Sequence, residues 1–297
     1  MKFSKSKVDY FQISLERQSY FPGEILRGNI LIGVSERFEI KKLSIYLCGK
    51  GKVHWSETSN ESSTYYDGFE NYINLEILIL NENSDETVFL EAGESTFPFE
   101  INLPYSLPSS YEDEVIDARI RYYIKATIKK RKIFSSIYTE TDFYIFNKMD
   151  LNLYNFPYVL NKNKYFGFGP FKSGPISIEF SLEKTGYSPG ELIPFNVYIH
   201  YERKKIIKKV KVRLIKYARF FASNRNKSKI LVENSIKYPY SIESDFLSWN
   251  DFLMVPQVWQ SSNGLSKIVQ VNYFVSLEIF FRFFRTTSLM IPVIIGI

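Results

Sequence analysis

Apolar and polar residues alternate with a period of two along much of the chain. The alternation is clearest in residues 43–47, 119–129, 176–183 and 210–214. This period is typical of β-strands that bury one face against a partner sheet and leave the other face in water. No long helical period with capping residues interrupts it. The sequence therefore predicts an all-β protein.

The same module occurs twice. Residues 14–26 (SLERQSYFPGEIL) correspond to residues 181–193 (SLEKTGYSPGELI) at an offset of 167, and residues 41–47 correspond to 208–214 at the same offset. A later segment, 120–124, corresponds to 271–275 at an offset of 151. A constant offset over about 30 residues is not expected by chance, so two tandem copies of one β module are predicted.

Each copy contains the motif Tyr-x-Pro-Gly-Glu. Proline presets φ at the second position of a type II turn and glycine accepts a positive φ at the third, so the motif predicts this turn type. Because the glutamate recurs in both copies, we interpret it as structural rather than catalytic. The turn residues are Tyr20, Pro22, Gly23 and Glu24 in the first copy and Tyr187, Pro189, Gly190 and Glu191 in the second.

The join between the copies is poor in alternation and holds Pro157, Pro170, several glycines and scattered Asn and Lys. This composition favours an extended connection. The expected boundaries are 1–147 for the first sandwich domain, 148–172 for the linker and 173–297 for the second.

Composition excludes several classes of protein. The chain has 297 residues, of which 45% are hydrophobic, enough for a sizeable core. One cysteine, Cys48, rules out a disulfide framework, and His54 and His200 are the only histidines. No catalytic residue, metal site or cofactor is therefore expected. The N-terminus shows no signal peptide pattern and no 18-residue apolar stretch occurs, so a soluble intracellular chain is expected.

The net charge of +6 is distributed unevenly. Residues 53–118 hold 15 acidic residues and no Lys or Arg, whereas 119–132 hold seven basic residues and 203–219 hold nine. In the alternation, Arg119, Arg121, Lys125 and Lys129 share one strand face, and residues 129–132 form a turn-like basic cluster. The candidate partner-binding residues are Arg119, Arg121, Lys125, Lys129, Lys130, Arg131 and Lys132 in the first block, and Lys204, Lys205, Lys208 and Lys209 in the second.

Two interpretations of these basic blocks stay open. They form a surface for acidic or phosphorylated tails, or for acidic membrane lipids, or they are solvated strand faces that pair with the chain's own acidic segment 53–118. Nucleic acid is not expected, because no recognition helix, zinc finger or RNA-binding motif accompanies the charge.

With these motifs in this order, the chain resembles the α-arrestin (arrestin domain-containing) family. The resemblance rests on the two Tyr-x-Pro-Gly-Glu turns, on residues 49–55, 90–93, 97–99 and 120–126, and on the final residues 291–296. It implies two tandem immunoglobulin-like β-sandwich domains, the arrestin fold. It also implies a non-enzymatic cytoplasmic adaptor, peripherally associated with the plasma membrane or endosomes. Such an adaptor serves endocytic trafficking, sorting or signalling by binding cytosolic tails of membrane proteins on sheet faces and strand edges.

The sequence departs from the family pattern in its last part. It stops at Ile297, where the last strand is expected, and contains no Pro-Pro dipeptide, so the Pro-Pro-x-Tyr motif that docks ubiquitin ligases in the family is absent. Ligase recruitment by this chain is therefore not expected. A retromer-type arrestin-fold coat subunit and, from a different class, a β-sandwich ligand-binding module remain as alternatives.

Overall fold

The computed structural model describes residues 8–59, 62–81, 88–130, 136–166, 173–201, 207–242, 244–282 and 285–297. Within these ranges the chain forms 19 β-strands and one 3-10 helix, and no α-helix. The prediction of an all-β protein is therefore confirmed. No helix in the described ranges is both long enough and apolar enough to span a bilayer.

The chain divides into two compact units, and each is described by itself. Unit 1 comprises Met1–Asn147 with the short segments Phe221–Arg225 and Asn263–Ile268, and unit 2 comprises Lys148–Phe220, Asn226–Ser262 and Val269–Ile297. The range expected as a linker contains the 3-10 helix η1 (Leu151–Tyr154) and the strand β11 (Tyr158–Phe166). Because β11 pairs with β12 (Ser173–Leu182), it is a strand of a unit 2 sheet. The exact boundaries at 147 and 172 stay predictions.

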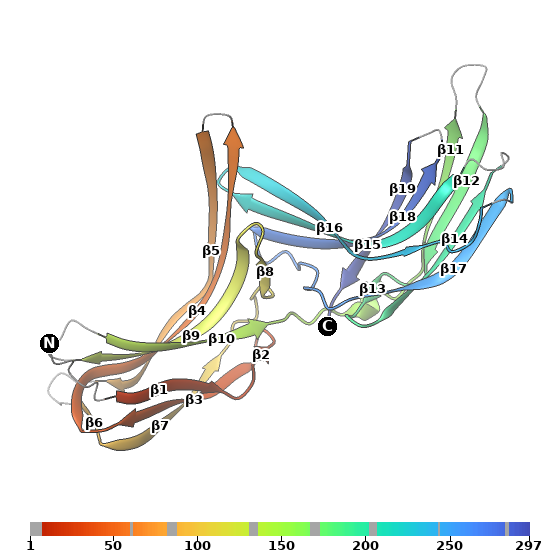
Figure 1. The fold of residues 1–297 in the computed structure, drawn as a ribbon. Helices are drawn as coiled ribbons and strands as arrows, with labels where there is room; N and C mark the ends of the chain where they lie inside the picture. The colour runs from red at the N-terminus through yellow and green to blue at the C-terminus, as the bar shows by residue number, and fades with distance from the viewer. Residues whose placement is uncertain are drawn as a thin grey trace. The chain divides into compact units, whose positions relative to one another are not determined.

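Unit 1 is a sandwich of a three-stranded and a seven-stranded sheet (Figure 1). The smaller sheet has the order β1 (Val8–Leu15), β3 (Ile25–Val34), β7 (Gly93–Asn102). The larger has the order β2 (Ser19–Tyr20), β10 (Ser136–Ile145), β9 (Ala118–Lys130), β4 (Phe38–Ser59), β5 (Ser62–Asn81), with β6 (Val88–Leu90) on β4 and β8 (Tyr111–Asp113) on β9. Alternate apolar residues of β3, β4 and β9 are fully buried between the sheets, as the period of two predicts.

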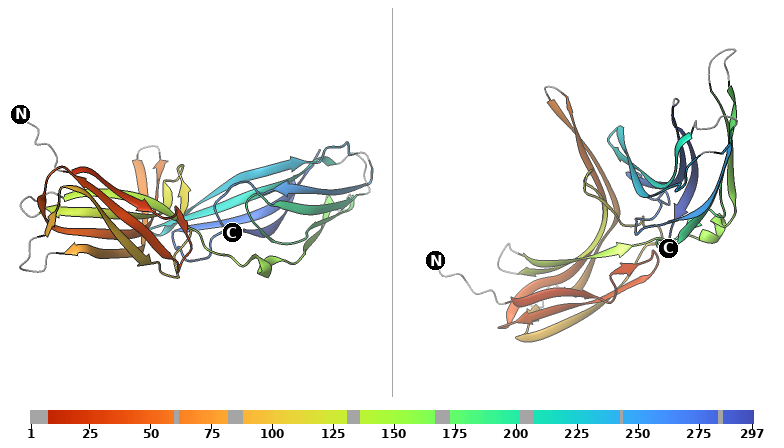
Figure 2. Two further views of the ribbon diagram at one scale, coloured as in Figure 1. Left: turned by 90° about the horizontal axis from the view of Figure 1, so that it is seen from below. Right: turned by 45° about the vertical axis from the view of Figure 1, so that its right-hand side comes forward.

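Unit 2 is a second sandwich, whose two layers Figure 2 shows from two further directions. One sheet has the order β11, β12, β14 (Leu192–His200), β17 (Phe246–Met254). The other has the order β13 (Gly186–Tyr187), β19 (Thr287–Ile295), β18 (Val269–Phe281), β15 (Ile207–Ala222), β16 (Arg225–Lys237). The core is apolar, and Val212, Leu214, Val275 and Leu277 have no exposed surface.

The two Pro-Gly turns have the same geometry. Gly23 and Gly190 have φ values of +83° and +88°. Glu24 N–H donates to the carbonyl of Phe21 at 3.2 Å, and Glu191 N–H donates to the carbonyl of Ser188 at 3.0 Å. A hydrogen bond from the fourth residue to the first, with a positive φ at the third, defines a type II turn.

The glutamate of each turn also holds the turn with its side chain. Glu24 Oε2 accepts from the Phe21 N–H at 2.9 Å, and Glu191 Oε2 accepts from the Ser188 N–H at 3.0 Å. Each carboxylate has a cationic partner, Arg17 for Glu24 at 3.3 Å and Lys184 for Glu191. Each glutamate therefore stabilises its own type II turn through equivalent contacts.

A second pair of equivalent hydrogen bonds fixes the middle of each unit. The Tyr122 hydroxyl donates to the Pro108 carbonyl at 2.7 Å, and the Tyr273 hydroxyl donates to the Trp259 carbonyl at 2.6 Å. The offset is 151 in both the donor and the acceptor, as in the later part of the sequence repeat. The repeat therefore extends from sequence to side-chain hydrogen bonds.

Candidate functional site

The first basic block lies on β9, near the middle of the larger sheet of unit 1. Arg119, Arg121, Lys125 and Lys129 point to the outer face of this sheet, because the buried residues of β9 alternate with them. Lys130 is the last residue of the strand. Arg131 and Lys132 lie outside the described residues, as do Lys204 and Lys205 of the second block.

Arg121 is neutralised by acidic residues of the neighbouring strand β10. Its Nε donates to Asp142 Oδ1 at 2.7 Å and its Nη2 donates to Glu140 Oε1 at 3.0 Å. Partial burial acts to lower the pKa of the guanidinium, but these two hydrogen bonds outweigh it and raise the pKa. The counter-charges come from residues 136–145 rather than from the acidic segment 53–118.

Other cations of this face also have partners. Lys125 Nζ lies 3.9 Å from the centre of the Tyr138 ring, a cation–π distance. On the adjacent strand β4, Lys52 Nζ contacts Asp117 at 2.7 Å and Lys42 Nζ contacts Glu76 at 2.5 Å. These two pairs do use the acidic segment 53–118. The β9 face is therefore a network of mixed sign rather than an uninterrupted positive surface.

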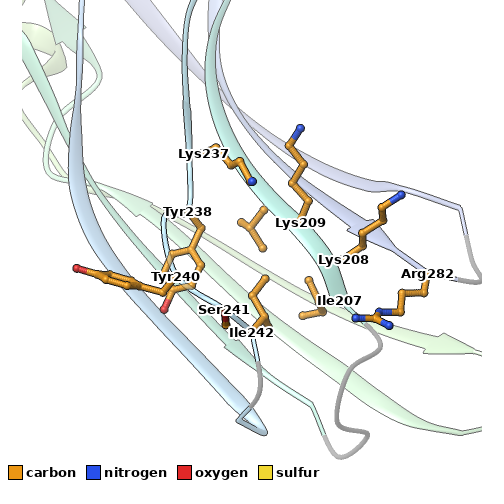
Figure 3. Close-up of a pocket in the computed structure, with 10 residues that line it drawn as sticks. Ile207, Lys208, Lys209, Lys237, Tyr238, Tyr240, Ser241, Ile242 and Arg282 are labelled. Atoms are coloured by element: carbon orange, nitrogen blue, oxygen red, sulfur yellow. The ribbon is translucent and has the colours of Figure 1, made fainter.

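The second basic block contributes to a pocket of about 380 Å³ in unit 2. Lys208 and Lys209 stand at the start of β15, Lys237 ends β16 and Arg282 follows β18. Figure 3 shows Tyr238 and Tyr240 on the other side of the pocket from Lys208 and Arg282. The remaining lining residues are Ile207, Val210, Ser241 and Ile242.

The charged side chains that line the pocket are all cationic. Four of its ten lining residues are cationic and none is acidic. The pKa of the Lys209 ammonium lies below its ordinary value because of its contact with Lys211, partial desolvation, and repulsion by Lys211, Arg213 and Lys208. Arg213 forms an ion pair with Glu278 at 2.9 Å, so the Glu278 carboxylate already has a cationic partner. Of the three cations that repel Lys209, only Lys208 lines the pocket, and an anion bound there would relieve its repulsion with Lys209.

The chemistry of this pocket suits a phosphate or a carboxylate. Three ammonium groups and one guanidinium offer charge-assisted hydrogen bonds, and the Ser241 hydroxyl and the tyrosine rings add neutral contacts. We define this set, Lys208, Lys209, Lys237, Tyr238, Ser241 and Arg282, as the anion pocket.

Sequence analysis named Lys208 and Lys209 as candidates but did not name Lys237 and Arg282. The structure brings the four together because β15 lies between β16 and β18. The segment Lys-Tyr-Pro-Tyr at residues 237–240 is visible in the sequence, but its place beside the start of β15 depends on the hydrogen bond from the Tyr238 N–H to the Val210 carbonyl, at 3.1 Å.

The cysteine and the histidines form no reactive cluster in the described ranges. Cys48 is buried, at 7% exposure, in β4. His54 Nδ1 lies 2.7 Å from Asp67 Oδ1 on the neighbouring strand β5, and His200 ends β14. Within the described residues, no three His, Cys, Asp or Glu side chains are placed to hold a metal ion.

Two β-sandwich units with the same type II turns and equivalent tyrosine hydrogen bonds define a tandem β-sandwich protein, and comparisons with known proteins specify its family. Residues 10–152 match the N-terminal domain of arrestin (or S-antigen), and residues 172–297 match its C-terminal domain. The chain therefore belongs to the arrestin family.

Several relatives place the chain in the arrestin domain-containing (α-arrestin) branch. It is 24% identical to arrestin domain-containing protein 17 of Caenorhabditis elegans, over 98% of this chain and 71% of that protein. It is 22% identical to human arrestin domain-containing protein 4, over 93% of this chain and 68% of that protein. Human arrestin domain-containing protein 1 is 23% identical, over 92% of this chain and 61% of that protein. The expected family and the arrestin fold are thus confirmed.

Proposed function

We propose that this chain is a cytoplasmic adaptor that binds acidic or phosphorylated cytosolic segments of membrane proteins during their trafficking, sorting or signalling. Arrestin-family membership supports the adaptor class, since arrestins are generally non-enzymatic adaptors that bind membrane-protein cargo. The observation that carries the anionic specificity is the anion pocket of unit 2, with four cationic side chains and no acidic lining residue.

The anion pocket supports this role better than the β9 face does. On β9, Arg121 already holds two carboxylates, whereas no described acidic residue lines the pocket. Removing an ion pair before binding an anion costs free energy, and a surface whose cations repel one another gains free energy when an anion arrives. Arg119 and Lys129 of β9 remain as a second, weaker surface.

A binding experiment with two synthetic peptides tests the proposal. The first is an acidic peptide with two phosphoserines and the second is its unphosphorylated counterpart, each titrated against the full chain. We expect the double variant Lys208→Gln and Lys237→Gln to weaken binding of the phosphorylated peptide by about tenfold or more, because two charge-assisted hydrogen bonds are lost. Binding of the unphosphorylated peptide should change little.

Two matched variants serve as controls. Lys41→Gln with Lys162→Gln removes the same charge from exposed strand positions outside the pocket, on β4 and β11, and should change affinity by less than about twofold. Arg119→Gln with Lys129→Gln tests the β9 face. Equal losses of affinity for the phosphorylated peptide in all three double variants would show that binding depends only on net charge. A loss of affinity in the β9 variant alone would place the binding site in unit 1.

Anionic vesicles distinguish the second source of negative charge. If the unaltered chain binds phosphatidylserine vesicles, the pocket variant does not, and neither binds the phosphorylated peptide, the pocket binds a membrane surface rather than a cargo segment. The relatives described above favour this adaptor class over the retromer-type coat subunit. Stoichiometric co-purification with a helical-solenoid partner would reverse that choice.

A further inference from the structure

The edges of the four sheets differ in how well they are protected against pairing with another chain. Basic residues, proline, bulges and short length all protect an edge strand. β2 and β13 are two residues long, β7 holds Pro98, and β1, β5 and β11 show shifts in register. β16 contains four basic residues. Each of these edges therefore carries at least one protective feature.

The edge strand β17 has none of these four features; its one protective device is the inward-facing charge of Asp251. It is the last strand of the sheet β11–β12–β14–β17, and its sequence FLSWNDFLM contains no Lys, Arg or Pro. All nine residues pair with β14 without a shift in register. Its single charged residue, Asp251, accepts a hydrogen bond from Trp249 Nε1 at 3.1 Å. The edge of β17 is therefore regular in its pairing and nearly uncharged.

The backbone groups that face outward from β17 belong to its even-numbered residues. Next to the strand, the Tyr201 N–H donates to the Asp245 carbonyl and the Val255 N–H donates to the Glu191 carbonyl, so odd-numbered residues bond to β14. In an antiparallel ladder the intervening residues point their N–H and C=O away from the partner strand. Ser248 and Asn250, the two central even-numbered residues, are therefore directed to the free edge.

Side chains close the two ends of this edge and leave its centre open. The Ser244 hydroxyl donates to the Phe246 carbonyl at 2.5 Å, and Asn234 Nδ2 donates to the Met254 carbonyl at 2.7 Å. The Phe252 N–H donates to Asp251 Oδ1 at 2.9 Å. Among the described residues, the outward backbone groups of Ser248 and Asn250 have no such partner. The open stretch is about five residues long.

The even-numbered residues also carry the exposed apolar side chains. Phe246, Phe252 and Met254 are 51%, 56% and 52% exposed. Leu192 lies opposite Met254 on β14 and is exposed on the same face. An added strand would place every second side chain beside this apolar row, while its backbone pairs with Ser248 and Asn250.

We propose that β17 binds a short extended peptide segment of a partner protein, with apolar residues at alternate positions, as an additional antiparallel strand. A partner peptide fits better than a second copy of this chain. Two copies of β17 paired about a two-fold axis would bring the Ser244 end of each against the Asn234 end of the other, where both edges are already closed. The proposal goes beyond the anion pocket, because no cation takes part.

The test uses a fluorescent synthetic peptide in which valine and threonine alternate between two terminal lysines. Titration into the full chain, followed by fluorescence anisotropy, should show saturable binding. Two further peptides carry N-methyl groups on the valines only or on the threonines only. Valines that lie beside the apolar row are opposite the even-numbered residues of β17, so in an antiparallel pair their N–H groups point at β17. Methylated valines should therefore abolish binding, and methylated threonines should leave the affinity within about twofold.

Variants of the protein locate the peptide. Asn250→Pro removes an N–H that no described partner uses, and proline is tolerated on edge strands. It should weaken binding by about tenfold or more, and Phe252→Ser by a few fold. The matched control Leu78→Ser, at an exposed apolar position on β5, should bind as the unaltered chain does.

Several results would overturn this proposal. They are no binding by the alternating peptide, equal effects of the two methylated peptides, or unchanged affinity in an Asn250→Pro variant that melts as the unaltered chain does. Self-association that Asn250→Pro abolishes, without peptide binding, would assign the edge to a second copy instead. The methylated peptides need only the unaltered chain, so the test stands even where a variant fails to fold. Loss of phosphopeptide binding in the pocket variant leaves this result unaffected.

Discussion

Replacing Tyr122 by phenylalanine should destabilise unit 1 by about 2 kcal/mol. Tyr122 is fully buried, and its hydroxyl donates to the Pro108 carbonyl at 2.7 Å. Phenylalanine keeps the ring contacts, including the one with Phe143, but leaves the buried carbonyl without its donor. A hydrogen bond lost in this way costs roughly 1–3 kcal/mol, because the remaining partner stays desolvated.

The equivalent variant in unit 2, Tyr273→Phe, should cost less. Its acceptor is the carbonyl of Trp259, a residue that is half-buried, whereas Pro108 is buried. Water can therefore replace part of the lost hydrogen bond at Trp259, and a cost of about 1 kcal/mol is expected.

Hydrogen exchange measured by mass spectrometry resolves the two units in one experiment. A loss of about 2 kcal/mol corresponds to roughly 30-fold faster exchange of the protected amides of β9, while those of β18 keep their rate. Tyr273→Phe should show the reverse with a smaller factor. The control Tyr65→Phe, at a side chain that is 65% exposed, should change neither. Unchanged exchange of β9 in Tyr122→Phe, or a larger effect for Tyr273→Phe, would refute the reasoning.

Three further predictions concern the second turn and the anion pocket. Glu191→Gln should remove stability that the unaltered chain has at neutral pH. Burial acts to raise the pKa of the Glu191 carboxyl, but Lys184 and the Ser188 N–H outweigh this effect and lower the pKa in the folded state. The stabilisation is therefore present above the pKa of the unfolded chain and is lost as the pH falls through the pKa of the folded chain, so the melting temperatures of the two proteins should converge in acid. Gly190→Ala should cost about 1–2 kcal/mol in urea unfolding, because φ is +88° although an added Cβ meets no atom within 4 Å, and a neutral result would contradict the assigned turn. Lys209→Gln should raise the melting temperature at low salt, since the Lys209 ammonium contacts Lys211 and is repelled by Lys211, Arg213 and Lys208 in the folded state. The gain should shrink at high salt, and a gain independent of salt would point to another cause.

The sequence repeat predicted much of the fold. The offset of 167 places the two turns, and the offset of 151 places Tyr122 and Tyr273, at equivalent positions in two sandwiches. These features depend on local backbone preference and on a period of two, both of which a sequence displays directly.

The electrostatic partners could not be predicted in the same way. Arg121 pairs with Glu140 and Asp142 because β10 lies beside β9 in a particular register, whereas charge counting pointed to the segment 53–118. The anion pocket likewise needs the order β18–β15–β16, which brings Arg282 and Lys237 to Lys208. Register between strands distant in sequence is a property of the packed sheet, and alternation alone does not specify it.

The short parallel pairings of β2 with β10 and of β13 with β19 have a kinetic consequence. Tyr20 pairs with Ile145, and Tyr187 pairs with Ile295, so each sandwich is closed by residues more than 100 positions apart. Bridging such a separation requires loop-closure entropy to be lost before the contact forms, which slows folding. Each sandwich is therefore expected to complete its folding late, after its last long strand has been synthesised, and to depend until then on protection from aggregation.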